Sequence, residues 1–267
     1  MGWLWLWPSG FSGASTAEEV TAGIDARGLV AVITGASSGI GLETARVLAL
    51  RGVHVVMAVR NVAAGRNASE AIRAEILGAI VHVLEMDLSS MDSVRSNNAG
   101  IKAWGCTRSV DGLELHFATN YIGHFLLTNL LMENMKSTSS ESGVEGRIVN
   151  VSFSGIFAYP QSKLASILHS TELARILKGE GDGVNISANA INPGVVETKM
   201  LTHNNIANAL VFPIGRIGAA TTCYVALHPQ VKGISGKYFS NCNLDSPSSH
   251  DSNAELAKKL WEFSSKH

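Results

Sequence analysis

The sequence is poor in the residues that mark several classes of protein. It has only three cysteines, Cys106, Cys223 and Cys242, with no C-x-x-C pair and no cysteine–histidine cluster at zinc spacing. We therefore expect free thiols in a reducing compartment and no metal site. Charged residues make up only 16% of the chain, the net charge is −1, and there is no basic run. A nucleic-acid partner, which needs clustered Lys and Arg, is excluded.

Long apolar runs are also missing, because none approaches the ~20 residues that span a bilayer. The N-terminus, MGWLWLWPSGFSG, alternates Trp and Leu and then breaks at Pro8 and Gly10. Tryptophan favours membrane interfaces, so a peripheral membrane contact stays open, although so short a run binds membranes weakly. We expect residues 1–22 to form a flexible Trp-rich segment ahead of a single domain, residues 23–267.

The rest of the chain alternates buried strands with helices. Strands are expected at 29–34, 53–59, 79–86, 147–152, 184–192 and 233–240, and helices between and after them, including long ones at 111–136 and from Pro160 onward. This alternation predicts an α/β fold with a doubly wound, Rossmann-like parallel sheet.

A glycine-rich turn, TGASSGIG, lies between the first strand and the first helix. Glycine lets the backbone approach a pyrophosphate, and the helix that begins there presents unpaired N–H groups to its charge. At the end of the second strand, Val59 stands where NAD binders carry an acid, and Arg60 can pair with a 2′-phosphate. The sequence favours NADP(H). The predicted binding residues of this part are Gly35, Ser37, Ser38, Gly39, Ile40, Gly41, Arg60 and Asn61.

A second pattern, AYPQSKL, spaces Tyr159 and Lys163 one helical turn apart. An ammonium group near a phenol lowers the phenol pKa, so that Tyr159 could transfer a proton at neutral pH. Ser152 follows a strand and could hold a carbonyl oxygen by a hydrogen bond. Pro160 disfavours helical backbone in Tyr159, which is expected just outside the helix.

These motifs occur in one order along the chain: TGASSGIG, Asp87-Leu88, NNAG, Asn120, Ser152, Tyr159-x-x-x-Lys163 and PGVVET. In this order the sequence resembles the short-chain dehydrogenase/reductase superfamily over roughly residues 20 to 267. The segments LELHFATNYIGHFLLTNLL and CYVALHPQVKGISGKYFS resemble its plant retinol-dehydrogenase-like branch. That branch includes an NADPH dehydrogenase associated with the chloroplast inner-envelope translocon.

The resemblance implies roles and a setting. Tyr159 would be the general acid/base, Lys163 would bind the nicotinamide ribose, Ser152 would orient the substrate, and Asn120 would support a proton-relay water. The further cofactor contacts that it implies are Asp87, Leu88, Asn98, Ala99, Gly100, Pro193, Gly194 and Thr198. It also implies a small lipophilic carbonyl or alcohol substrate, a homodimer through the helices that carry Asn120 and Lys163, and a chloroplast location, with the cytoplasm as alternative.

The chain departs from the family between Asp87-Leu88 and NNAG. Only Ser89–Asn97 intervene, and this polar link cannot form a buried central strand. We expect that strand to be absent and strand 147–152 to pair directly with strand 29–34 in a six-stranded sheet, since nine residues span ~30 Å. The segments between Ser152 and Tyr159 and between Met200 and Arg216 are short as well.

Two functional hypotheses follow from these features. The complete motif set favours an NADP(H)-dependent oxidoreductase that interconverts a carbonyl and an alcohol. The shortened segments favour instead a catalytically impaired dinucleotide-binding scaffold, or a redox-sensing subunit at a chloroplast membrane complex.

Overall fold

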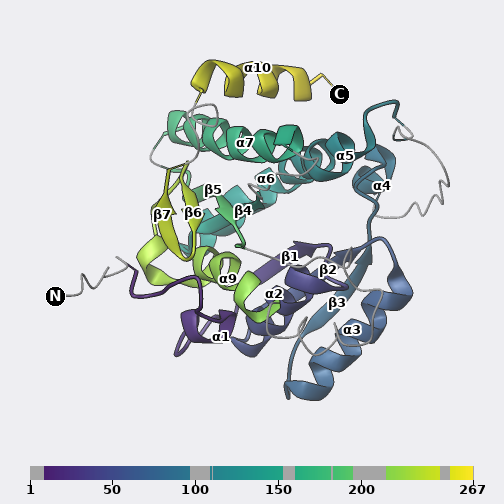
Figure 1. Ribbon diagram of the computed structural model, residues 1–267, viewed down its shortest axis with the longest axis vertical. Helices are drawn as coiled ribbons and strands as arrows, with labels where there is room; N and C mark the ends of the chain where they lie inside the picture. The colour runs from purple at the N-terminus through teal and green to yellow at the C-terminus, as the bar shows by residue number, and fades with distance from the viewer. Residues whose placement is uncertain are drawn as a thin grey trace.

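The computed structural model describes residues 9–96, 109, 111–152, 160–181, 183–194, 215–246 and 253–266. Within these residues the strands form two sheets rather than one (Figure 1). The first sheet has the order β1-β2-β3 and is parallel, with β1 at Val30–Thr34, β2 at His54–Val59 and β3 at Val81–Glu85. The second has the order β4-β5-β6-β7, with β4 at Gly146–Val151, β5 at Ile186–Asn192, β6 at Tyr238–Ser240 and β7 at Asn243–Asp245. Only β7 is antiparallel to its neighbour.

Helices α2 (Gly39–Leu50) and α3 (Val62–Glu75) pack against the first sheet. Alternate residues of β2 form the centre of this core, because Val55 and Met57 are fully buried. Asn61 caps the N-terminus of α3 by accepting a hydrogen bond from the Ala64 N–H at 3.1 Å. After β3 the link that we described as polar forms a short helix, α4 (Met91–Ser96), which the sequence analysis did not predict.

Two helices of the middle of the chain run side by side over the second sheet (Figure 1). A short α5 (Leu115–Phe117) and a π-helical turn, Ala118–Ile122, continue into α6 (Gly123–Ser142). This helix ends at Ser142, six residues later than expected, and Gly143 with a positive φ of 68° forms its C-cap. Helix α7 (Pro160–Gly179) then leads to β5. The long helix predicted at 111–136 is therefore present but interrupted by a π turn.

The N-terminal residues that the structure describes pack onto the domain. Helix α1 (Ala17–Val20) begins with a capping box between Thr16 and Glu19, and Val20 is buried against α9 (Ala220–Leu227). A 3₁₀ turn, Pro229–Val231, follows α9. The division at residue 22 stays a prediction, although α1 lies in the core on the N-terminal side of it.

Arg46 of α2 ties this region together. Its guanidinium, only 9% exposed in its side chain, contacts Glu18, Glu43 at 2.7 Å and Glu75 at 2.8 Å, so it joins the N-terminal segment to α2 and α3. These carboxylates raise the pKa of Arg46. One buried cation is thus balanced by three surrounding acids.

The last helix, α10 (Ala254–Ser264), lies across α7 (Figure 1). Its Trp261 stacks on His169 of α7, with ring centroids 5.6 Å apart, and meets Phe125 of α6 edge-on at 5.0 Å. The Tyr121 hydroxyl pairs with Ser264 at 2.8 Å. An aromatic cluster therefore fixes α10 to the π turn, α6 and α7.

The prediction that β4 pairs directly with β1 in one six-stranded sheet is wrong. No strand lies between β3 and β4 in the part of the chain that the structure describes, yet β1 and β4 belong to separate sheets. The prediction considered only whether the link was long enough. Helices α6 and α9 pack against elements of both sheets, so the two sheets are connected by helix packing rather than by strand pairing. The hairpin strand β7 was also missed, because three residues give no periodic signal.

Candidate active site

The predicted site residues follow the carboxyl ends of strands in both sheets. In parallel α/β sheets ligands bind at this edge, so the local geometry there decides what the site can hold. The strand ends concerned are those of β1, β2 and β3 for the dinucleotide, and those of β4 and β5 for the substrate and nicotinamide.

The turn after β1 is shaped for close approach. Gly35 and Gly39 have positive φ values of 63° and 58°, which other residues rarely adopt. A Cβ on Gly41 would stand 2.6 Å from the carbonyl oxygen of Gly35, so only glycine lets α2 begin this close to the turn. Ser38 precedes α2 without capping it, and no acid lies in the first turn of the helix. The free N–H groups there fit a pyrophosphate.

The ends of β2 and β3 supply the next predicted contacts. Val59 is buried and offers no acceptor, whereas Arg60 is exposed and has no ion-pair partner among the described residues. Asp87 is buried, and its Oδ1 accepts hydrogen bonds from the N–H and hydroxyl of Ser89 at 2.9 and 2.6 Å. Asp87 thus has a local role in the turn before α4, besides the predicted contact with the cofactor.

The second sheet presents Ser152 and the Asn-Pro-Gly turn. Ser152 is buried directly after β4, and its N–H donates to the carbonyl of Ile191 at 2.7 Å. Asn192 ends β5, and its side-chain oxygen accepts from the N–H of Gly194 at 3.0 Å, where Gly194 has a positive φ of 81°. Both turns lie where a β4–β5 pair ends, so they face the same edge of the sheet.

Asn120 lies in the π turn before α6, half-buried, and its side-chain amide donates to the hydroxyl of Ser162 on α7 at 3.3 Å. Ser162 immediately precedes Lys163, so the hydrogen bond brings the Asn120 turn to the start of the Lys163 helix. The backbone of Lys163 belongs to α7, but its side chain lies outside what the structure describes. Single π turns inside helices often occur at functional sites.

Several predicted residues fall outside the described part of the chain. They are Asn98, Ala99, Gly100, Tyr159 and Thr198. Their roles stay predictions. The structure adds two residues that the sequence did not single out: Ser162, the partner of Asn120, and His124, whose Nε2 lies 2.9 Å from the Thr34 hydroxyl. His124 follows Asn120 by one helical turn, a spacing that could have indicated a shared face.

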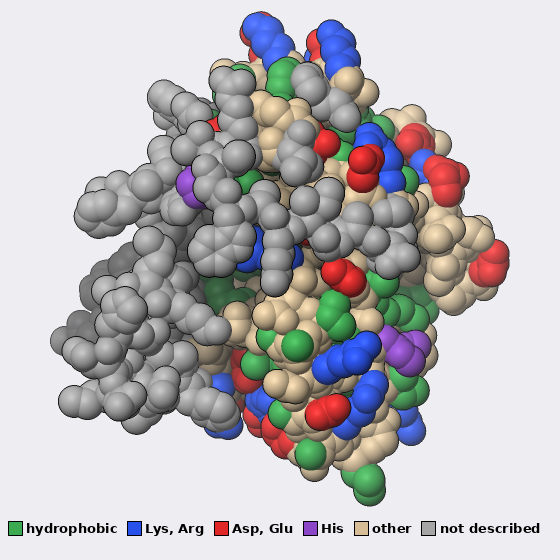
Figure 2. Space-filling view, turned by 90° about the vertical axis from the view of Figure 1, so that its right-hand side faces the viewer, with side chains coloured by type: hydrophobic (Ala, Val, Ile, Leu, Met, Phe, Trp, Pro, Cys, Tyr) green, Lys and Arg blue, Asp and Glu red, His purple; other side chains and the backbone are tan. Residues whose placement is uncertain are grey.

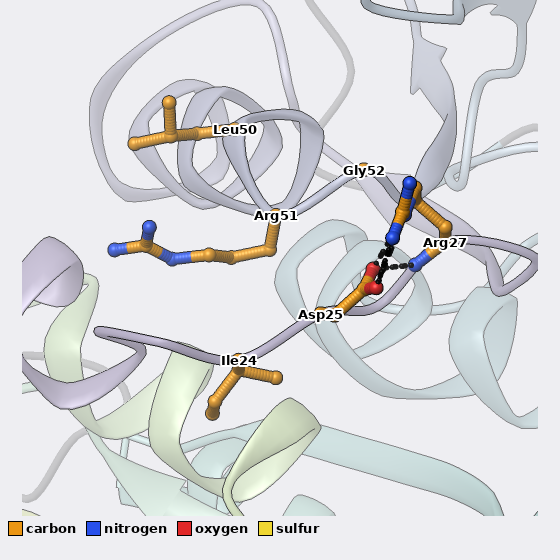
Figure 3. Close-up of a pocket in the computed structure, with 6 residues that line it drawn as sticks. All are labelled: Ile24, Asp25, Arg27, Leu50, Arg51 and Gly52. Carbon is orange, nitrogen blue, oxygen red and sulfur yellow. Dashed lines mark hydrogen bonds and ion pairs between the residues drawn. The ribbon is translucent and has the colours of Figure 1, made fainter.

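A shallow cavity of about 280 Å³ lies at the opposite ends of β1 and β2, before each strand begins (Figure 3). Asp25 holds the Arg27 side chain there, with the closest contact at 2.5 Å, whereas the Arg51 side chain points away from this pair and donates to the Thr21 hydroxyl at 2.9 Å. A groove of about 410 Å³ along α6, between α4 and the end of α10, is the other cavity of note. Neither includes a predicted site residue. Among the described residues no group of three or more His, Cys, Asp or Glu could hold a metal ion.

Comparisons with known proteins agree with the motif order. A family model described as short chain dehydrogenase matches residues 29–113 and 95–209. The chain is 45% identical to "Short-chain dehydrogenase TIC 32 B, chloroplastic" of Brassica napus over 97% of this chain and 94% of that protein. It is 35% identical to human "Retinol dehydrogenase 12" over 89% and 85% of the two chains. An uncharacterized protein from Mycobacterium paratuberculosis superposes with a TM-score of 0.70 at 29% identity, covering 96% of both chains.

The alignment with the Brassica napus protein runs over 303 positions, more than the 267 residues of this chain. That relative therefore carries residues that this chain lacks. The two matches to the family model overlap over residues 95–113, just after the start of which the shortened link ends at Asn97. The position of the missing residues stays a prediction.

Proposed function

The chain belongs to the short-chain dehydrogenase family, and we propose that it is an NADP(H)-dependent oxidoreductase that interconverts a lipophilic carbonyl compound and its alcohol. The observation that carries this proposal is the hydrogen bond from Asn120 to Ser162, beside Lys163. It supports a polar site at the start of α7, the helix that follows β4 and Ser152 in the chain.

When bound, the dinucleotide supplies or accepts the hydride. The chain's own residues do the rest. The glycine turn and the start of α2 bind the pyrophosphate through backbone N–H groups. Arg60 pairs with the 2′-phosphate, which an NAD-type acid in place of Val59 would repel. This preference for NADP(H) rests on the identity of two residues at the end of β2.

In the proposed reduction, Ser152 donates a hydrogen bond to the substrate carbonyl, and Tyr159 delivers a proton to the same oxygen. The Lys163 ammonium lowers the pKa of the Tyr159 phenol, so that its proton can transfer at neutral pH. Asn120 orders a water that returns a proton to the tyrosine. Each of these roles is inferred from the family motif and stays a proposal for this chain.

The test is NADPH oxidation by the purified full chain with a panel of aldehydes, ketones and retinoids. Turnover that disappears in Tyr159→Phe but persists in Tyr224→Phe is expected. Tyr224 is the matched control because it belongs to α9, outside the predicted site, and its hydroxyl donates to the Gln230 side chain at 2.9 Å. NADPH binding without turnover on any substrate would contradict the proposal.

That outcome would favour the second candidate, a dinucleotide-binding scaffold or redox-sensing subunit at a chloroplast membrane complex. The observation behind it is the division of the sheet, because Ser152 and the glycine turn lie on separate sheets. A sensor needs only the glycine turn and Arg60. An enzyme needs the two sheets held in one fixed relation.

We propose a chloroplast location because the 45%-identical relative is named chloroplastic; the cytoplasm is the alternative, and organelle fractionation distinguishes them. Among the described residues no helix is both long and apolar enough to cross a membrane. The face in Figure 2 mixes Lys and Arg with Asp and Glu in its described part. Homodimerisation through α6 and α7 also stays a proposal. Helix α10 covers part of α7 and leaves less of that helix for a dimer contact, and gel filtration checks the oligomeric state.

A further inference from the structure

Helix α6 packs against both sheets. In its first half, Leu126 and Leu127 join a core cluster with Ala58 of β2. In its second half, Met132 packs with Ile186 of β5. No strand bridges β1 and β4 in the described residues, so α6 is one of the elements on which the relation between the two sheets depends.

The start of α6 makes an unusually close contact with the first sheet. A Cβ on Gly123 would stand 2.3 Å from the carbonyl oxygen of Leu88, in the turn after β3. Real side chains do not approach a backbone oxygen so closely, and that carbonyl is part of a folded turn. Glycine at this position is therefore what lets the helix reach the end of β3.

The next residue makes a second contact with the same sheet. The Nε2 atom of His124 lies 2.9 Å from the hydroxyl oxygen of Thr34, the last residue of β1. Thr34 directly precedes the glycine turn at Gly35. One helical turn before His124, the side-chain amide of Asn120 donates a hydrogen bond to the Ser162 hydroxyl of α7. Within five residues, the chain contacts both the dinucleotide turn and the Lys163 helix.

We propose that Gly123 and His124 form a positioning joint, which holds the catalytic residues of the second sheet at a fixed distance from the dinucleotide turn of the first. In this protein the joint does what strand pairing between β1 and β4 would otherwise do. The inference rests on the proposed function, because it concerns the alignment of that same site. His124 is proposed as a positioning residue that acts through Thr34.

The joint predicts a specific kinetic signature. The dinucleotide turn belongs wholly to the first sheet, so losing the His124 contact should leave NADPH affinity within threefold of wild type. The reacting groups would shift relative to one another, and a misplacement of about 1 Å can cost ~100-fold in rate. We expect kcat of His124→Ala to fall at least tenfold while the Kd for NADPH is nearly unchanged.

Conservative variants separate positioning from bulk packing. A glutamine amide can reach the place of Nε2, whereas the shorter asparagine cannot, so His124→Gln should recover most of kcat and His124→Asn should not. His82→Gln, at an exposed site on β3, is the matched control and should behave as wild type. Equal kcat values for the alanine, asparagine and glutamine variants would overturn the proposal.

The glycine is tested in the same way. Gly123→Ala should lower kcat at least tenfold, because its Cβ pushes α6 away from Leu88. Gly179→Ala, at the end of α7 with no atom within 4 Å of the added Cβ, is the matched control. A kcat for Gly123→Ala within threefold of wild type would overturn the proposal, as would a loss of NADPH affinity as large as the loss in kcat.

A measurement without turnover distinguishes failure of the joint from failure of the proposed function. Spin labels at exposed positions on the two sides, Arg66→Cys on α3 and Lys178→Cys on α7, report the distance between the sheets in the full chain. Cys106→Ser removes a third labelling site, since Cys223 and Cys242 are buried. His124→Ala should broaden the distance distribution and His124→Gln should restore it. A distribution in His124→Ala that equals that of wild type would overturn the joint. If the wild type is inactive but His124→Ala still broadens the distribution, the joint stands and only the proposed enzyme activity is contradicted.

Discussion

His169 provides a quantitative test of the packing between α7 and α10. It is 3% exposed, neither ring nitrogen has a hydrogen-bond partner among the described residues, and Tyr121, Phe125 and Trp261 surround the ring. Burial, with a smaller contribution from the charge of His124, lowers the pKa of His169 to about 4 from its usual 6.5. The folded protein therefore holds this imidazole neutral where the unfolded chain would protonate it.

The consequence is a loss of stability on acidification. Between pH 6.5 and about 4 the unfolded state binds one proton more at this residue than the folded state, so the free energy of unfolding falls as the pH falls through this window. Below about pH 4 both states are protonated and the effect levels off. Lowering the pKa of His169 from 6.5 to about 4 corresponds to roughly 3 kcal/mol of stability at neutral pH.

The perturbation is His169→Phe, which keeps an aromatic ring against Trp261 and removes the titration. Urea unfolding at pH 7, 6, 5 and 4 measures the free energy of unfolding of both proteins. Wild type should lose about 3 kcal/mol more than the variant between pH 7 and pH 4, and His82→Gln, at an exposed site, should follow wild type. Parallel curves for wild type and His169→Phe would refute the reasoning, since carboxylates common to both would then explain the acid sensitivity.

Three further predictions concern charge and the dinucleotide turn. Arg46→Met should lower the free energy of unfolding, measured by urea unfolding, by about 3 kcal/mol, because it leaves three acids around a buried site. The control Arg27→Met removes an exposed ion pair and should cost under about 0.5 kcal/mol. Arg60→Ala should weaken NADPH binding about tenfold by fluorescence titration and leave NADH binding unchanged, with Arg66→Ala on α3 as control. Gly41→Ala should abolish binding of both dinucleotides in the same titration, because its Cβ collides with a backbone carbonyl of the turn.

The parts of the fold that the sequence predicted well are those with local signals. The apolar run at residues 29–34 became β1, AIVHVLEM contains β3, and AELAKKLWEF became α10 almost residue for residue. The glycine turn also has the predicted geometry, since positive φ at Gly35 and Gly39 is a local requirement. Each of these signals depends on near neighbours in the chain.

The features that were missed depend on contacts between distant residues. Ser162 and His124 have no motif of their own, and their partners Asn120 and Thr34 are 42 and 90 residues away in the chain. The prediction of a single six-stranded sheet was wrong for the same reason, because the arrangement of the sheets depends on contacts between distant residues. Chain length limits how far apart β3 and β4 can be, but the packing of α6 and α9 determines where they are.

The two open strand edges show how the divided sheet bears on function. Strands of parallel sheets are normally buried, yet Val30 and Val32 of β1 are 66% and 40% exposed, and Val151 at the end of β4 is 38% exposed. Each sheet nevertheless has a core cluster of its own, so we expect that neither binding of a dinucleotide nor folding of the second sheet depends on a strand between them. The proposed hydride transfer needs atoms from both halves within about 3.5 Å of one another, and therefore a fixed relation between the two sheets. Without a shared hydrogen-bonded ladder, the proposed catalysis requires helix contacts such as that of His124 with Thr34 to hold the two sheets as firmly as a ladder would.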